Sequence, residues 1–140
     1  MQLEKWSPRI LSILRIFTGL VLLQHGTGKW LGFPAVPTFA KTSATSLSGM
    51  AGLLEFVVGV LFVVGLFTRP VAFVLSGMTA VAYFISHAPR GFYPILNGGE
   101  LAALYCFVFF YFVFAGPGPW SIDAAISQRR TSAGGHGFIR

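Results

Sequence analysis

The fold is decided by the segment Leu53-Leu54-Glu55-Phe56-Val57-Val58-Gly59-Val60-Leu61-Phe62-Val63-Val64-Gly65-Leu66, which is apolar except for the carboxylate of Glu55. Extended back to Gly49, the segment reaches the roughly 20 residues with which a helix crosses the hydrocarbon core of a bilayer. A charged side chain at the centre of such a helix costs about 2.5–3.5 kcal/mol on insertion scales. We therefore expect other membrane helices to supply polar partners for Glu55.

The composition is that of a membrane protein. Of the 140 residues, 54% are hydrophobic and only 10% are charged, whereas a soluble domain carries about 25% charged residues. In a soluble protein, the net charge of +6 would suggest a nucleic-acid partner. Here the basic residues mostly flank apolar runs, where such residues set orientation and contact lipid head groups. We expect the lipid bilayer as a partner and no nucleic acid.

Apolar runs separated by loops rich in proline and glycine predict an all-α membrane protein, a bundle of four transmembrane helices. The expected helices cover residues 9–31, 49–67, 70–87 and 98–115. They belong to one domain, residues 9–127, which follows a polar lead-in at residues 1–8. Ser121 is expected to cap a short surface helix. Residues 128–140 are polar and glycine-rich, and we expect this tail to be disordered.

The distribution of basic residues predicts the orientation. Four spans place both termini on one side of the membrane, and that side holds more Lys and Arg than the other. The two sets are Lys5, Arg9, Arg69, Arg129, Arg130 and Arg140 against Lys29, Lys41 and Arg90. The positive-inside rule therefore puts both termini of this multi-pass protein in the cytoplasm. The first apolar run is too long for a signal peptide, so we expect it to be retained as a helix.

Several ionisable residues fall at matching depths in the expected helices. His25 lies six residues before the expected end of the first helix, and Glu55 lies six residues after the expected start of the second. In an antiparallel hairpin the two therefore meet at the same depth, ~9 Å below the outer surface. Lys29 lies one turn from His25 on the same face. His87 and Glu100 lie near the outer ends of the third and fourth helices, so we expect all five to converge.

Ionisable residues within membrane helices are rare and mark functional sites. Arg15 lies deeper than the others, but only ~40° from Lys29 around the helix, so we expect it to face the bundle interior as well. We interpret the set as a pocket with catalytic proton-handling groups (His25, Glu55) and substrate-binding groups (Arg15, Lys29, His87, Glu100). In the alternative interpretation the groups only neutralise one another and fix helix register, with Arg15 and Lys29 extending to head groups.

Small residues are assigned structural roles. Gly52 and Gly59 bracket Glu55 on its face, where glycine allows a neighbouring helix to approach closely. We group Arg69 and Asp123 with them as structural residues.

The two histidines and two glutamates of the predicted pocket could also ligate a metal. Neither an HExxH nor an ExxH spacing supports that alternative, so we assign no metal site. Haem ligation by His25 and His87 is disfavoured because both residues lie at the same end of the bundle. The single cysteine, Cys106, permits neither an intrachain disulfide nor a CxxC motif.

Taken in order, the polar and glycine motifs resemble those of the DoxX family. They are Leu14-Arg15-Ile16, His25-Gly26-x-x-Lys29, Gly52-x-x-Glu55, Gly65-Leu66-x-Thr68-Arg69, His87, Gly99-Glu100 and Gly116-Pro117-Gly118-x-Trp120-Ser121-x-Asp123. The match covers about residues 9–125. The resemblance implies a small bacterial four-helix protein of the inner membrane that is linked to redox work. Relatives include a membrane subunit of thiosulfate:quinone oxidoreductase and membrane partners in complexes that handle oxidative or thiol stress.

Three functions remain open at this point. The first is a quinone-linked oxidoreductase subunit that binds a quinone or similar small molecule near the outer leaflet, with no covalent cofactor and with a soluble or membrane redox partner. The second is a proton-coupled small-molecule transporter, for which four helices are few unless the chain forms a homo-oligomer. The third is a non-catalytic scaffold that recruits a soluble enzyme through Thr68, Arg69 and residues 116–130. We take the first as the leading hypothesis.

Overall fold

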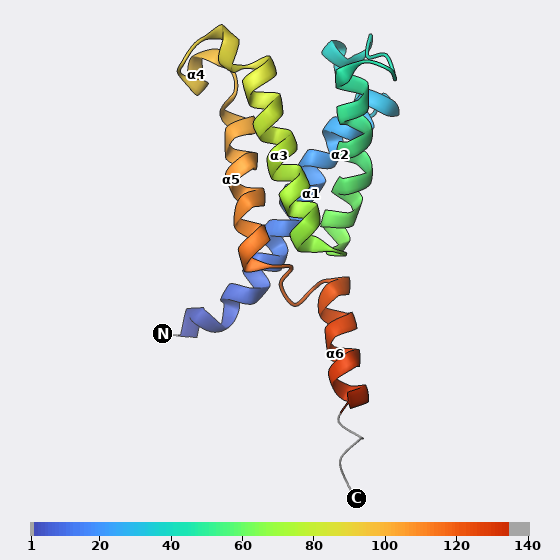
Figure 1. Ribbon diagram of the computed structural model, residues 1–140, viewed down its shortest axis with the longest axis vertical. Coiled ribbons are helices and arrows are strands. Elements are labelled where there is room, and N and C mark those ends of the chain that lie inside the picture. The colour runs from blue at the N-terminus through green and yellow to red at the C-terminus, as the bar shows by residue number, and fades with distance from the viewer. Residues whose placement is uncertain (1, 135–140) are drawn as a thin grey trace, which may run out of the picture.

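The computed structural model describes residues 2–134, and this part of the chain is all-α, as predicted (Figure 1). Four long helices form the body: α1 (Ser7–Trp30), α2 (Leu47–Val64), α3 (Thr68–Ser86) and α5 (Glu100–Ala115). The shorter elements are η1 (Gln2–Trp6), η2 (Pro37–Phe39), η3 (Ala88–Arg90), α4 (Pro94–Asn97) and α6 (Ile122–Gly134).

The helix ends follow local signals in the sequence. The Ser46 hydroxyl accepts the backbone N–H of Gly49 at 3.1 Å and caps α2. Gly65 adopts φ 70 and ends α2 at Val64, earlier than the predicted end at residue 67. A glycine in this left-handed conformation terminates a helix because it redirects the chain without a steric penalty.

Three helical segments are long and apolar enough to cross a membrane: Leu3–Trp30, Leu47–Val64 and Thr68–Arg90. With 16 residues, α5 is shorter, and it reaches about 24 Å against the ~30 Å of a hydrocarbon core. Large apolar side chains point outward from the helices, with Phe17 66%, Phe73 64% and Phe107 72% exposed. Lipid, rather than water, is the solvent that suits such a surface.

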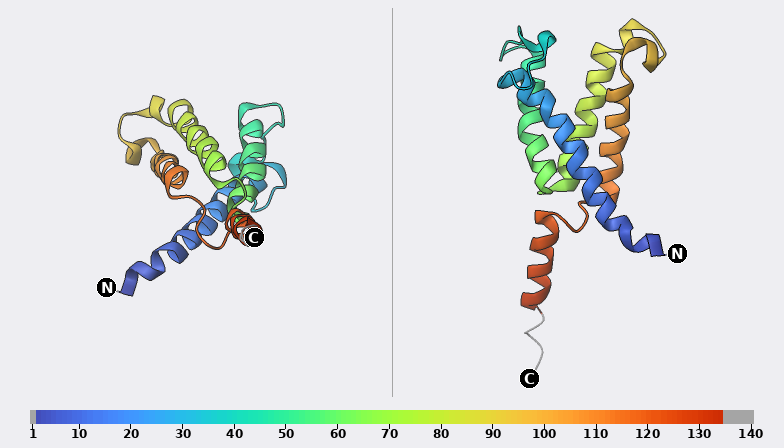
Figure 2. Two further views of the ribbon diagram at one scale, coloured as in Figure 1. Left: turned by 60° about the horizontal axis from the view of Figure 1, so that its bottom comes forward. Right: turned by 180° about the vertical axis from the view of Figure 1, so that it is seen from behind.

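The long helices pack as two hairpins. α1 lies along α2 and α3 lies along α5, whereas α2 and α3 meet over a shorter stretch. Figure 1 and the right view of Figure 2 show the hairpins close together at one end and diverging toward the other, with α1 crossing the bundle obliquely. We call the closed end, which contains the α2–α3 turn at residues 64–68, the base. The first residues of α1 and the whole of α6 also lie at the base.

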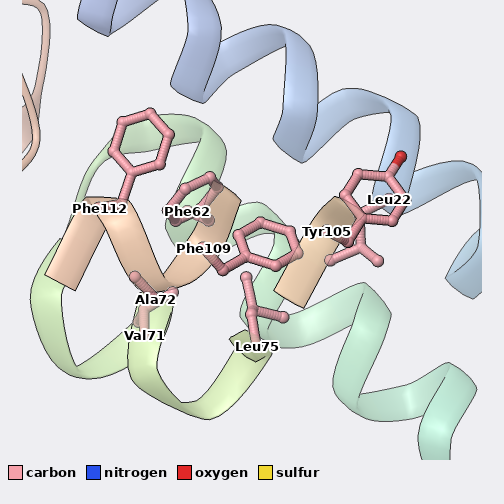
Figure 3. Close-up of a cluster of buried hydrophobic side chains, with 8 residues drawn as sticks. All are labelled: Leu22, Phe62, Val71, Ala72, Leu75, Tyr105, Phe109 and Phe112. Atoms are coloured by element: carbon pink, nitrogen blue, oxygen red, sulfur yellow. The ribbon is translucent and has the colours of Figure 1, made fainter. Parts of the chain in front are cut away.

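The hydrophobic core fills the half of the bundle nearer the base. The rings of Phe109 and Phe112 each meet Phe62 edge to face, with centroids 5.1 Å apart (Figure 3). The buried cluster draws on all four long helices and consists of Leu22, Phe62, Val71, Ala72, Leu75, Tyr105, Phe109 and Phe112. Farther from the base, α3 and α5 present small side chains to the space between the hairpins, among them Thr79, Ala82 and Ala102. These side chains leave that space unfilled.

Polar contacts hold helix ends together at the base. The Asp123 carboxylate accepts the backbone N–H groups of Phe67 at 2.9 Å and Thr68 at 2.8 Å, which caps the N-terminus of α3. Arg69 donates to the Val113 carbonyl at 2.7 Å, near the C-terminus of α5. A negative charge at a helix N-terminus and a positive charge at a C-terminus both complement the helix dipole.

α6 corrects the prediction of a disordered tail from Gln128. The Ser121 hydroxyl accepts the Ala124 N–H at 3.0 Å, as expected for the cap, but the helix continues to Gly134. Its alanine, glutamine and arginine residues are good helix formers, and neither proline nor glycine interrupts them before Gly134. Residues 135–140 of the predicted tail lie outside the described residues.

Candidate functional site

A cavity of about 370 Å³ lies where the hairpins diverge, and we call it the central cleft. Four of the six predicted site residues line it: His25, Lys29, Glu55 and His87. The other lining residues are mostly small or apolar, namely Leu22, Phe39, Ser48, Thr79, Ala82, Ser86, Gly98, Leu101, Ala102 and Tyr105. The structure therefore brings residues from all four long helices and their loops to one space.

A buried ion pair lies at the inner wall of the central cleft. Lys29 Nζ lies 3.0 and 2.8 Å from the two carboxylate oxygens of Glu55. The two side chains are only 10% and 11% exposed. The partner that the buried Glu55 requires is thus Lys29, while His25 contributes to the same cavity without bonding to the carboxylate.

Helix geometry explains this pairing. Side chains tilt toward the N-terminus of their own helix, and α1 and α2 run antiparallel, so Lys29 and Glu55 lean toward each other. Gly52 makes room for the lysine, because a Cβ at Gly52 would lie 2.9 Å from Lys29 Cβ and 2.8 Å from its Cδ. At Gly26, a Cβ would lie 2.6 Å from a backbone nitrogen of α2, so the two helices touch at backbone level there. Both glycines therefore position the ion pair.

Phe39, which has no role among the predicted site residues, covers two of the polar groups. Its ring centroid lies 6.1 Å from that of His25 and 5.4 Å from Lys29 Nζ. The ring is delivered by η2, in the loop between α1 and α2. The loop at residues 31–46 contains two phenylalanines, Phe33 and Phe39, and its sequence does not indicate which of them covers the polar groups.

Asn97, which is also not among the predicted site residues, positions His87 at the rim of the cleft. His87 Nδ1 lies 3.2 Å from the Asn97 carbonyl oxygen. The Asn97 side chain is buried, donates to the Gly91 carbonyl at 2.8 Å and accepts the Gly99 N–H at 2.8 Å. It thereby ties the loop between α3 and α5 together. The Asn97-Gly98 pair, a turn signal, could have indicated this role.

Arg15 lies at the base and not in the central cleft. It is fully buried, which confirms that it faces the interior, but it is separated from Lys29 by about 21 Å along α1. Its guanidinium donates to the backbone carbonyls of Val63, Pro117 and Trp120. The prediction that it holds charge in the pocket is corrected, because two residues on one face of a long helix can lie near opposite ends of the bundle.

Glu100 and Gly59 also differ from their predicted surroundings. Glu100 is exposed in the first turn of α5, where its charge complements the helix dipole, and it does not line the cleft. A Cβ at Gly59 would lie 3.4 Å from Leu23 Cδ1, an ordinary contact, so this glycine is not required for close packing. Among residues 2–134, no group of three His, Cys, Asp or Glu side chains is arranged to hold a metal ion.

Apolar outward faces around a buried ion pair and a polar cleft define an α-helical integral membrane protein. The sequence model of the DoxX family matches residues 10–88. The chain belongs to the DoxX family, as its motifs predicted.

Two relatives match most of the chain. An uncharacterized protein of Haemophilus influenzae is 45% identical over 125 residues, which are 86% of this chain and 93% of that protein. An uncharacterized membrane protein of Mycobacterium tuberculosis is 25% identical over 142 residues, which are 91% of this chain and 87% of the relative. No solved structure matches the chain.

Proposed function

We propose that this protein is a redox-linked membrane subunit that binds a quinone, or a small molecule like it, in the central cleft. The observation that carries the proposal is the convergence of His25, Lys29, Glu55 and His87 on one cavity of about 370 Å³. Ligand pockets for small molecules measure roughly 300–1,000 Å³ and combine apolar walls with a few placed polar groups. The central cleft has both properties.

A quinone head group suits the chemistry of these side chains. Its carbonyl oxygens accept hydrogen bonds from Lys29, and the hydroxyls of the reduced quinol donate to Glu55. The hydrogen bonds within residues 2–134 include none from the His25 ring or the Tyr105 hydroxyl, so both groups are available to a ligand. Reduction to the quinol takes up two electrons and two protons. The imidazole of His25 can carry a proton for this step, while the electrons come from a redox partner.

We further propose four membrane spans with both termini in the cytoplasm of the inner membrane. α5 packs along α3 and would be the fourth span, with outward-facing Phe107 and Phe114. The base carries the larger set of basic side chains, at Lys5, Arg9, Arg69, Arg129 and Arg130. The positive-inside rule assigns that side to the cytoplasm.

Reporter fusions test this topology. A green fluorescent protein joined after Arg140 is expected to fluoresce, and alkaline phosphatase at the same position is expected to be inactive. Phosphatase inserted in the loop between α1 and α2, at Lys41, is expected to be active, because this loop lies at the end opposite the base. The reverse pattern, or active phosphatase at both positions, would contradict the proposed topology.

A binding titration tests the proposed function. Purified protein in nanodiscs is titrated with 2,3-dimethoxy-5-methyl-1,4-benzoquinone, which lacks a tail. Glu55→Gln is expected to weaken binding about tenfold, because the variant loses a charged hydrogen-bonding group but keeps the side-chain shape. The matched control is Glu100→Gln, at an exposed glutamate outside the cleft, and it should bind like the wild type. Equal affinity in all three proteins, or no binding by the wild type, would refute the proposal.

A further inference from the structure

A second hollow continues from the central cleft to the surface between α2 and α3. It measures about 650 Å³, and we call it the side groove. It shares with the central cleft Lys29, Ser48, Glu55, Thr79, Ala82 and Ser86. The rest of its lining is entirely apolar: Leu47, Met50, Ala51, Leu54, Val74, Gly77, Met78, Val81 and Ile85. The side groove thus has a polar inner end, at the ion pair, and apolar walls leading outward.

The outer mouth of the side groove faces lipid. Met50, Val81 and Ile85 are 56%, 55% and 54% exposed. They belong to α2 and α3, both of which are long and apolar enough to span the membrane. A ligand that reaches the ion pair along this groove therefore comes from the bilayer and has a long apolar part.

Gly77 leaves the side groove open. A Cβ at Gly77 would meet no atom within 4 Å, whereas a Cβ at Gly26 or Gly52 would clash with a neighbouring helix. Packing between helices therefore does not require glycine at this position, although glycine is disfavoured inside a helix relative to alanine. The missing side chain instead widens the groove.

The charges at the inner end favour a neutral head group. Lys29 and Glu55 neutralise each other at 2.8 Å and are both nearly buried. A charged head group placed beside this pair would lose its hydration water. Neither Lys29 nor Glu55 could compensate that loss, because each is already paired with the other. A neutral head that both accepts and donates hydrogen bonds satisfies the pair without that cost.

We propose that the side groove binds the apolar tail of a single-tailed ligand with a neutral polar head, which enters from the bilayer between α2 and α3 and places its head at the Lys29–Glu55 pair. This inference rests on the proposed function for the head site. It adds the class of ligand and the route by which the ligand enters.

The test compares the tailless benzoquinone with the same ring carrying a decyl tail, in nanodiscs of one lipid composition. For the wild type, the decyl compound is expected to bind at least about tenfold more tightly, because several methylene groups become buried. Gly77→Leu fills the groove and is expected to remove most of this gain while leaving the affinity for the tailless ring unchanged. The matched control is Val57→Phe, which enlarges a side chain that is 49% exposed on α2 and lies outside the groove. The partition of each compound into the bilayer is the same for every variant, so a difference between variants reports binding to the protein.

The outcomes separate the two proposals. If the tailless ring binds in a Glu55-dependent manner but the decyl gain is equal in wild type and Gly77→Leu, the side-groove inference is wrong and the head site stands. If neither compound binds to the wild type, both proposals fail. Decanoate and decyltrimethylammonium test the head group: both should bind at least tenfold more weakly than decylquinone, and equal binding by either would overturn the neutral-head assignment.

Discussion

Lys29→Met is expected to lower the free energy of unfolding by about 3–5 kcal/mol, the cost of breaking a buried ion pair by removing one partner. The substitution preserves most of the side-chain volume over Gly52 but leaves the Glu55 carboxylate, 11% exposed, without a cation. Reversible unfolding in mixed micelles with increasing dodecyl sulfate measures the loss. Lys41→Met, at an exposed lysine of the α1–α2 loop, is the matched control and should change stability little.

The double variant Lys29→Met/Glu55→Leu distinguishes an ion-pair effect from a packing effect. Removing both charges is expected to restore most of the stability, because apolar replacement of a whole buried pair is often neutral. If the double variant is as unstable as the sum of the two single variants, the side chains do not interact and the ion pair is not what stabilises the α1–α2 hairpin.

Arg15→Met is expected to cost at least about 4.5 kcal/mol, because hydrogen bonds to a charged group are worth about 1.5–3 kcal/mol each and the Arg15 guanidinium donates three of them. The guanidinium donates to Val63 at 3.2 Å, to Trp120 at 2.5 Å and to Pro117. Without it, buried carbonyls of the α2 end and the 116–121 loop lose their donor. Thermal unfolding in nanodiscs measures the change, and Arg9→Met, at an exposed arginine of α1, is the control.

Arg15→Lys separates the role at the base from a role in ligand binding. A lysine keeps the charge but lacks the planar fork that serves several acceptors at once, so it should recover only part of the stability. Because Arg15 lies outside the central cleft, the folded Arg15→Lys protein is expected to bind the tailless quinone like the wild type. A tenfold weaker affinity with unchanged stability would instead place Arg15 in the binding site.

The sequence was informative where a local pattern has one structural solution. The long helices match their predicted ranges within a few residues, although α2 ends at Val64, before the left-handed Gly65, and not at the predicted residue 67. Placing His25 and Glu55 by their distance from the helix ends brought them into the same cavity. This placement was possible because the rise per residue fixes the depth of a side chain once the two helices are assumed to form an antiparallel hairpin.

What the sequence did not predict depends on contacts between distant segments. The choice of Lys29 as the partner of Glu55 depends on side-chain tilt and on the space over Gly52. The position of Arg15 depends on the path of the 116–121 loop, and that of Phe39 on how the α1–α2 loop folds over the cleft. None of these is encoded in helical periodicity or in the spacing of a single segment.

The family motifs divide between the two ends of the bundle. Arg15, Arg69 and Asp123 bond to backbone groups at helix ends and loops of the base. His25, Lys29, Gly52 and Glu55 lie at the central cleft, or in the case of Gly52 directly beneath the lysine stem. We therefore interpret the base as the part that fixes the angle between the hairpins, whereas the central cleft is the proposed ligand site.

Photoaffinity labelling with an azido-substituted benzoquinone tests whether the quinone ring binds in the central cleft, because peptide mass spectrometry locates the bound ring. We expect labels on residues that line the central cleft, above all Lys29, Phe39 and Tyr105, and we expect these labels to disappear when excess unlabelled quinone is present. Labels confined to lipid-facing positions such as Phe107 and Tyr111, unaffected by the competitor, would contradict this expectation.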